Sequence, residues 1–245
     1  MSTFGLLFGL VEVVVVVFLV VRLRRVVRRV RASRAILVDA LDEALAAELP
    51  AGLGRVLATE AAVFAYAATG WRHPTPTEGF STHRERSYFV IAGVIGFLLL
   101  VETLGLHVIL SHVSVVAAWI VTALSIYSLV WIVGDTQAVR LHPLRLTPDG
   151  LVIVQGLRWR TEVPWQILDA AEPIDAAPAG VRRLGPIGAN VLLRLRAPVD
   201  LRGPFGLHRR ADRLALTVDG RESFLAAVSR LAETPRQDPQ PSLAV

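Results

Sequence analysis

The sequence of 245 residues contains no cysteine and no lysine. Without cysteine the chain has no disulfides, no thiolate metal ligands and no cysteine nucleophile. All 26 basic residues are arginines, which we attribute to a compositional bias of the genome rather than to chemistry. The chain also lacks a glycine-rich phosphate loop, a G-x-S-x-G nucleophile elbow and a kinase signature. No catalytic motif therefore favours an enzyme.

Apolar residues, by contrast, are abundant. They make up 53% of the chain, and the mean hydropathy is +0.51, which is more apolar than a soluble domain of this size requires. The excess lies in three runs, residues 4–21, 88–110 and 113–133. At about 1.5 Å per residue, each run is long enough to cross a hydrocarbon core. We expect three transmembrane helices, the last two forming a tight hairpin.

The distribution of arginine predicts how these helices are oriented. No arginine precedes the first run, which therefore resembles a retained anchor rather than a cleaved signal peptide. Arginines follow the first run, precede the second and follow the third, which places residues 22–87 and 134–245 in the cytoplasm. We expect a multi-pass protein of the cytoplasmic membrane, with its N-terminus outside and its C-terminus in the cytoplasm.

Seven arginines immediately follow the first run: Arg22, Arg24, Arg25, Arg28, Arg29, Arg31 and Arg34. They can bind anionic lipid headgroups, at about 1 kcal/mol for each arginine near the surface. Alternatively, they act only as the signal that orients the first helix. The net charge of +5 also raises the possibility of nucleic acid, but much of the basic charge lies beside a membrane run. We expect no nucleic-acid partner.

Two further helices are expected between the first and second runs. Leucines recur at helical spacing from Ile36 to Leu49 among acidic residues, which predicts an amphipathic helix ended by Pro50. A second helix is predicted from about Leu53 to Thr69. Its apolar stretch is too short to span a bilayer, so we expect it at the membrane interface or against the C-terminal domain.

From Leu144 onward the pattern changes to short β-like segments. We expect strands at residues 144–147, 151–155, 157–163, 166–171, 190–196, 199–201 and 213–218, followed by a helix at 221–233. Seven short strands and one amphipathic helix predict a small, partly open β-barrel plugged at one end. The domains are then a membrane domain at 1–140, a β-domain at 141–234 and a tail at 235–245.

Two segments, LRLTPDGLVIVQGLRWRTEVPWQIL and DRLALTVDGRESFLAAVSRL, resemble bacterial pleckstrin-homology-like (PH-like) domains. The whole chain resembles uncharacterised bacterial multi-span membrane proteins that carry such a domain at the C-terminus. The resemblance implies an α-helical membrane region followed by a small all-β PH-like barrel with a C-terminal capping helix. Eukaryotic relatives often bind phosphoinositides through a basic loop. Here the corresponding turn, residues 155–158, has a single arginine, so this ligand is not carried over.

Polar residues inside the predicted spans are candidates for chemistry, because a charge at mid-membrane is costly. Glu12 and Glu102 both lie about 12 Å below the outer boundary at helical rise, and Thr122 lies at a similar level. Glu12 and Glu102, together with His107 and His112, form a candidate proton or divalent-metal site. The alternative is a protonated glutamate that forms hydrogen bonds between helices.

Other polar residues near the spans are given structural roles. We expect Asp135 to pair with Arg140 or with an arginine near the first run. We expect His73, His83 and His142 to be solvated or to face headgroups.

The sequence thus favours a non-enzymatic membrane scaffold or adaptor without a cofactor, which presents a PH-like domain at the inner face of the cytoplasmic membrane. Its expected partners are a bilayer with anionic headgroups, another protein and a second copy of the chain. The alternative is a membrane-embedded enzyme or transporter component that uses Glu12, Glu102 and His107 with a proton or a divalent metal. Three spans are few for a transport path, so this alternative requires oligomerisation.

Overall fold

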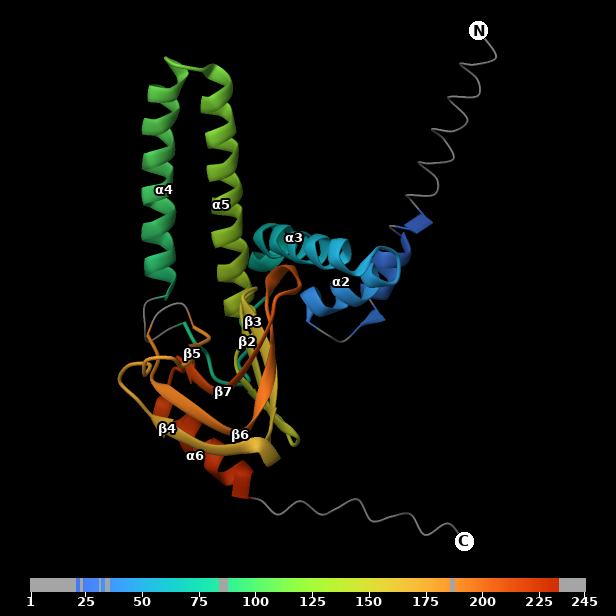
Figure 1. Ribbon diagram of the computed structural model, residues 1–245, viewed down its shortest axis with the longest axis vertical. Helices are drawn as coiled ribbons and strands as arrows, with labels where there is room; N and C mark the ends of the chain where they lie inside the picture. Colours follow the sequence, from blue (N-terminus) through green and yellow to red (C-terminus); the bar gives the residue numbers. More distant parts are fainter. Residues whose placement is uncertain are drawn as a thin grey trace.

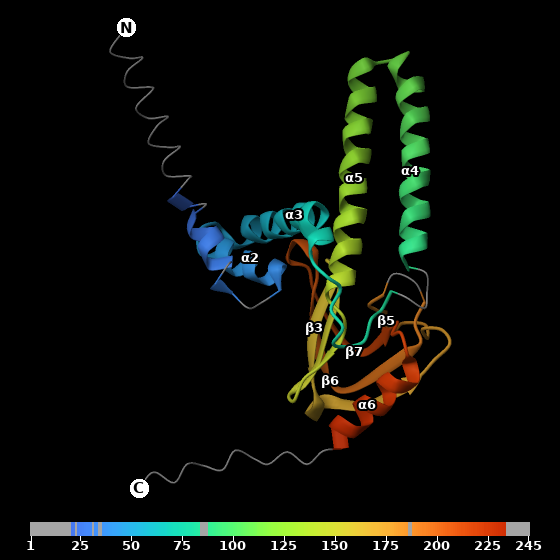
Figure 2. The ribbon, with the colours of Figure 1, turned by 180° about the vertical axis from the view of Figure 1, so that it is seen from behind.

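The computed structural model describes residues 21–22, 24–30, 32–33, 36–83, 88–185 and 188–233. A long helical hairpin, two shorter helices beside its base and a sheet beneath it make up this part of the chain (Figure 1). The hairpin and the sheet lie at opposite ends of the molecule, and the view from behind shows the same arrangement (Figure 2).

The hairpin consists of α4 (Tyr88–Ser111) and α5 (Val115–Leu141), with 24 and 27 residues. Ser114 begins α5 as an N-cap, its Oγ accepting a hydrogen bond from the Ala117 N–H at 3.3 Å. Both helices are long and apolar enough to cross a membrane, and only 6% of the most apolar window of each is buried. Two of the three predicted spans therefore have the expected length and composition. The first, residues 4–21, lies outside the described residues except for Val21.

The hairpin differs from the prediction mainly at the C-terminal end of α5. The predicted third span stops at Val133, whereas α5 continues without a break to Leu141. Its last turns are more polar, and most of their side chains are buried: Gly134, Asp135, Gln137, Ala138 and Val139. The apolar run ends where α5 passes from an exposed to a buried environment. Hydropathy therefore predicts the apolar span but not the full length of the helix.

The two helices expected beside the membrane are α2 (Leu37–Ala46) and α3 (Ala51–Thr69), followed by a short 3₁₀ turn, η1 (Gly70–Arg72). α2 ends at Ala46 rather than at Leu49. An apolar cluster joins α2, α3, α5 and the β2–β3 turn: Val38, Ala62, Val63, Tyr66, Ala138 and Leu157.

The C-terminal part forms a mixed seven-stranded sheet in the order β1-β2-β3-β6-β7-β5, with β4 also paired to β6. Its strands are β1 (Arg145–Leu146), β2 (Gly150–Gln155), β3 (Trp159–Pro164), β4 (Leu168–Pro173), β5 (Arg182–Arg183), β6 (Val191–Arg202) and β7 (His208–Leu216). Short 3₁₀ turns, η2 (Trp165–Ile167) and η3 (Pro204–Gly206), precede β4 and β7. β5 is parallel to β7, and the other pairs are antiparallel. The helix α6 (Arg221–Glu233) lies where a helix was predicted.

Two features of the sheet differ from the prediction. Segments 190–196 and 199–201, expected as separate strands, form the single strand β6. The register with β7 shifts between Arg194 and Val199, which accommodates Pro198, a residue without an N–H for the ladder. In addition, β5 forms inside the segment expected to be a loop. The described pairings run from β1 to β5 without closing, so the barrel and its likeness to PH domains stay predictions.

The core of the sheet consists of apolar strand residues. Leu151, Ile153, Leu193, Leu214 and Leu216 are fully buried, and the residues between them in β2 and β7, Val152 and Ala215, are also apolar. Phe224 and Val228 of α6 complete this cluster and cover one opening of the sheet. The sheet and α6 thus form a unit with its own apolar core.

Candidate functional site

The helix α5 connects the hairpin directly to the sheet. Its inner end lies between α3 and the β2–β3 turn, where Gly134 allows the two helices to touch: a β-carbon at this position would lie 2.6 Å from the Val63 carbonyl oxygen. α5 runs as one unbroken helix from the hairpin turn to this point.

A buried carboxylate holds this junction together. Asp135 Oδ1 accepts a hydrogen bond from the Leu157 N–H at 2.9 Å, and Oδ2 accepts one from the Tyr88 hydroxyl at 2.8 Å. Arg158 Nη2 lies 3.0 Å from Oδ2, and the side chain of Asp135 is only 9% exposed. One carboxylate thus joins α5, the start of α4 and the β2–β3 turn. The expected ion pair of Asp135 is present, but its predicted partner was wrong.

Arg140, the partner expected for Asp135, instead fastens the end of α3 and the loop behind it. Its guanidinium donates to the Gly70 carbonyl at 2.6 Å, the His73 carbonyl at 3.0 Å and Thr75 Oγ1 at 3.0 Å. Further along this loop, the carboxylate of Asp219 accepts hydrogen bonds from the Ser81 hydroxyl and the His83 N–H. The segment between α3 and α4 is therefore attached to both α5 and the sheet.

Of the histidines expected in solvent, His83 is buried and His142 is half-buried. His83 is 6% exposed, with its ring 4.6 Å from that of Phe89. His142 Nδ1 lies 2.8 Å from the Ala138 carbonyl and Nε2 lies 3.4 Å from the Tyr66 hydroxyl. Burial lowers the pKa of His142 and raises that of Tyr66. His83 contacts Phe89 at the start of α4, and His142 contacts Tyr66 of α3, so both environments depend on residues of other elements.

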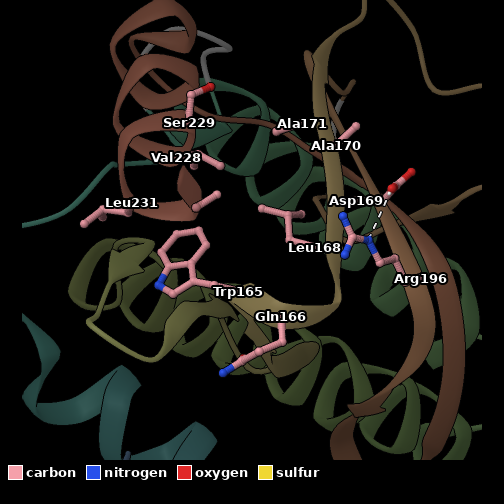
Figure 3. A pocket seen from close by; sticks show the side chains of 11 residues that line it. Trp165, Gln166, Leu168, Asp169, Ala170, Ala171, Arg196, Val228, Ser229 and Leu231 are labelled. Carbon is pink, nitrogen blue, oxygen red and sulfur yellow. Dashed lines mark hydrogen bonds and ion pairs between the residues drawn. The ribbon is translucent and has the colours of Figure 1, made fainter. Parts of the chain in front are cut away.

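A groove lies on the opposite side of the sheet from the hairpin, between β4 and α6 (Figure 3). Its volume is about 470 Å³. It is lined by Trp165, Gln166, Leu168, Asp169, Ala170, Ala171, Arg196, Val228, Ser229, Leu231 and Ala232. No sequence motif predicts this groove, because its walls come from a strand and a helix about 60 residues apart.

The floor of this β4–α6 groove is apolar and its rim is charged. Trp165, Leu168 and Val228 are 6%, 7% and 2% exposed. The Trp165 indole N–H donates to the Thr147 carbonyl at 3.0 Å, which fixes the ring as part of the floor. On the rim, Arg196 Nε lies 3.4 Å from Asp169 Oδ1, with both side chains largely exposed (Figure 3). Such an exposed pair is weak and can exchange for a ligand group.

The groove offers few titratable groups to a ligand. Its lining contains no histidine, and its one carboxylate, Asp169, is paired with arginine. Within the described part of the chain, β4 pairs only with β6, so its other edge has no strand partner. Four successive residues of β4 line the groove, and an unpaired strand edge is a template for an extended peptide.

The residues predicted to form an intramembrane site lie apart in the hairpin. Glu102 is exposed on α4, whereas His107 turns toward α5, with Nδ1 2.8 Å from Thr122 Oγ1. His112 is exposed in the turn, and its Nδ1 lies 2.7 Å from the Val108 carbonyl oxygen. Glu12 lies outside the described residues, and the proton or metal layer that includes it stays a prediction.

The arginine cluster after the first run is described in part. Arg22 Nε and Arg29 Nη1 each lie 3.5 Å from the carboxylate of Glu48, which ties this segment to the end of α2. Arg24, Arg25 and Arg28 are exposed. Arg31 and Arg34 are outside the described residues. At least three arginines of the cluster are thus available to an anionic surface.

No group of three or more histidine, aspartate or glutamate side chains in the described ranges could hold a metal ion. No protein-family model, curated protein or solved structure matches this chain. The resemblance to PH-like domains therefore rests on the two sequence segments that carry it, and function has to be argued from the junction and the groove.

Proposed function

We propose that the chain is a membrane-anchored adaptor without enzymatic activity. The hairpin α4–α5 crosses the cytoplasmic membrane and holds the sheet, as a PH-like domain, at the inner face. The β4–α6 groove then binds an extended segment of a protein partner, whose backbone pairs with the free edge of β4.

The observation that carries this proposal is the continuity of α5. A single helix of 27 residues begins at the hairpin turn and ends in a buried junction with the sheet. A flexible tether would suffice to keep a domain near a membrane. A fixed junction supports a role in which the orientation of the domain matters, as it does for an adaptor that presents one surface to a partner.

The position and chemistry of the groove also support an adaptor. It lies at the end of the molecule away from the hairpin, so a bilayer around α4 and α5 leaves it open to the cytoplasm (Figures 1, 2). Leu231 on its rim is 38% exposed, and its floor offers Trp165 and Leu168 to an apolar side chain. The Asp169–Arg196 pair offers both charges to a polar one.

Selection of peptides from a random display library on the full chain in detergent tests the groove. Selected peptides are expected to protect the amides of β4 from hydrogen exchange and to lose binding at least tenfold with Ser229→Trp, which fills the groove from α6. Ala226→Trp is the matched control, because Ala226 is exposed on the same helix and does not line the groove. Failure to select any peptide, or equal binding to both variants, contradicts the proposal.

A further inference from the structure

The helix α3 has one buried face and one exposed face. Ala58, Ala62, Val63 and Tyr66 are at most 6% exposed and pack on α2 and α5. Thr59 Oγ1 on the same side accepts a hydrogen bond from the Phe205 N–H at 2.9 Å, so the β6–β7 loop also covers this face. On the remaining side of the helix, several apolar side chains are exposed.

That exposed side is apolar. Leu53, Val56, Leu57 and Phe64 are 51%, 40%, 41% and 52% exposed, and the exposed Ala61 and Ala68 lie among them and just after them. These positions recur at three- and four-residue spacing and so form one stripe along the helix. Trp71, just beyond the end of α3, is 63% exposed and extends the stripe. Glu60 is the one acidic residue in it.

The stripe faces in the direction of the hairpin turn. Val63, on the buried side, contacts α5 at Gly134, whereas Glu60 accepts a hydrogen bond from the Tyr127 hydroxyl at 2.6 Å. Tyr127 lies about two helical turns nearer to the hairpin turn than Gly134 does. Both ribbon views show α3 lying across the base of α5, with α2 on the side away from the hairpin (Figures 1, 2).

The depth of this crossing matches the thickness of a bilayer. Gly134, where α3 touches α5, lies roughly 28 Å along the helix from Val115 at about 1.5 Å per residue. The hydrocarbon core of a bilayer is about 30 Å thick. If Val115 lies at the outer boundary, α3 lies at the inner one.

We propose that α3 lies along the inner surface of the bilayer, with Leu53, Val56, Leu57 and Phe64 inserted among the lipid chains. This inference rests on the proposed function, because it requires that α4 and α5 cross the same bilayer. Its apolar stripe then continues the lipid-facing surface of the hairpin without a break. Interfacial helices of this kind are amphipathic and lie in the plane of the membrane.

The residues around the stripe fit this location. The Trp131 indole N–H donates to Tyr127 Oη at 3.0 Å, and the Trp131 ring lies 5.9 Å from that of Phe205, which is itself 42% exposed. Tyrosine and tryptophan favour the boundary between lipid chains and headgroups. The hydrogen bond from Tyr127 satisfies the carboxylate of Glu60, the one charge in the stripe. The exposed Arg24, Arg25 and Arg28 precede α2 and can reach anionic headgroups.

With the hairpin perpendicular to the membrane and α3 parallel to it, two non-parallel helix axes are fixed relative to the bilayer. The sheet can then neither rotate about the hairpin nor tilt toward the lipid. The β4–α6 groove is held facing the cytoplasm.

The absence of cysteine makes a direct test simple. Single cysteines replace Leu57, Phe64, Leu104 and Glu43 in the full chain, which is reconstituted in vesicles of phosphatidylcholine and phosphatidylglycerol and labelled with a nitroxide. Leu104, 70% exposed on α4, reports on the hairpin, and Glu43, exposed on α2, reports on the aqueous side. The measurement is the accessibility of each label to oxygen, which concentrates in lipid, relative to a water-soluble nickel complex.

The expected result is an oxygen-to-nickel ratio at Leu57 and Phe64 that resembles Leu104 and exceeds Glu43 severalfold. Labels at Leu57 and Phe64 that favour nickel, while Leu104 favours oxygen, overturn this inference and leave the membrane anchor intact. A label at Leu104 that favours nickel overturns both. Labels at Leu57 and Phe64 that are shielded from both reagents show that a second copy or another protein covers the stripe, and this also overturns the inference.

Discussion

The carbonyl oxygen of Val63 approaches the α-carbon of Gly134 so closely that a β-carbon on residue 134 would lie 2.6 Å from it. α3 and α5 therefore meet backbone to backbone at this point. The contact sets the level at which α3 crosses the hairpin, and with it the position of the sheet below.

Gly134→Ala is expected to separate the two helices and lower stability. Alanine normally stabilises a helix relative to glycine by about 0.5–1 kcal/mol, but overpacking at a closed contact costs about 1–3 kcal/mol. The thermal midpoint in detergent, followed by tryptophan fluorescence, should fall. Gly105→Ala on α4 is the control, because a β-carbon there meets nothing within 4 Å, and its midpoint should not fall. A Gly134→Ala variant as stable as this control would contradict the close packing of α3 on α5.

Asp135→Asn tests the carboxylate at the junction. The amide keeps the shape of the side chain but removes the charge that pairs with Arg158, whose side chain is 28% exposed. Breaking a buried ion pair from one side costs about 3–5 kcal/mol, and the partial exposure of Arg158 lowers the expected loss to roughly 2–3 kcal/mol. Denaturant unfolding of the variant in detergent measures this loss.

Asp200→Asn makes the same chemical change in an exposed pair with Arg210, where the two side chains are 61% and 76% exposed. Solvent screens this pair, so its removal should change stability little. Equal losses for the two variants would show that Asp135 does not hold the junction together.

Local patterns predicted those elements that depend on neighbouring residues alone. The two described apolar runs became α4 and α5, and the periodic apolar residues of 221–233 became α6. The strands expected at 190–196 and 199–201, in contrast, form the single strand β6, although Pro198 removes a hydrogen bond from the ladder. The shift in register within β6 absorbs that loss, and no single-strand pattern reveals it.

The junction and the groove could not be predicted for a different reason. Asp135 is bound by Tyr88 and by the Leu157–Arg158 turn, and these segments are brought together only by the docking of α5 on the sheet. Arg140, five residues from Asp135, was the nearest candidate by sequence but points toward α3. The burial of His142 similarly depends on Tyr66, which lies 76 residues away. Residue types suggest such interactions, but only the tertiary structure selects the partners.

The burial of His142 predicts a stability that depends on pH. Burial lowers its pKa in the folded chain below the unfolded value of about 6.5, so the unfolded chain binds the proton more readily. The stabilising effect of the neutral ring is complete above about pH 6.5 and is lost as the pH falls toward the folded pKa. Tyr66, Arg145 and Asp39 are the titratable or charged groups that act on this ring.

His142→Gln should therefore flatten the fall in thermal midpoint between about pH 6.5 and pH 5. His73→Gln is the control, because His73 is exposed and its replacement should leave the slope unchanged. The thermal midpoints of the wild type and both variants are measured in one detergent across this range. A slope that persists in His142→Gln would assign the pH dependence to other groups.

The role of His107, which forms a hydrogen bond with Thr122, distinguishes the proposed adaptor function from the metal-dependent alternative. Thr122 Oγ1 donates to the Ala118 carbonyl at 2.9 Å, so it accepts from His107 Nδ1–H at 2.8 Å and joins the two helices. Interhelical bonds in membranes contribute about 0.6 kcal/mol on average and at most about 1.7. Thr122→Val should lower the free energy of unfolding by about 0.6–1.7 kcal/mol. Thr103→Val, which removes only a bond within α4, is the matched control and should have a smaller effect.

The Nε2 atom of His107 takes no part in the hydrogen bond to Thr122, and the Nε2 of a neutral imidazole can bind zinc. A metal that binds only the folded chain raises its stability in proportion to the logarithm of the metal concentration. For an adaptor whose His107 only joins helices, zinc should raise the thermal midpoint of the wild type no more than that of His107→Ala or Glu102→Gln. A rise in the wild type that both variants lose would instead establish a metal site at these residues, and the hairpin rather than the groove would then be the functional centre.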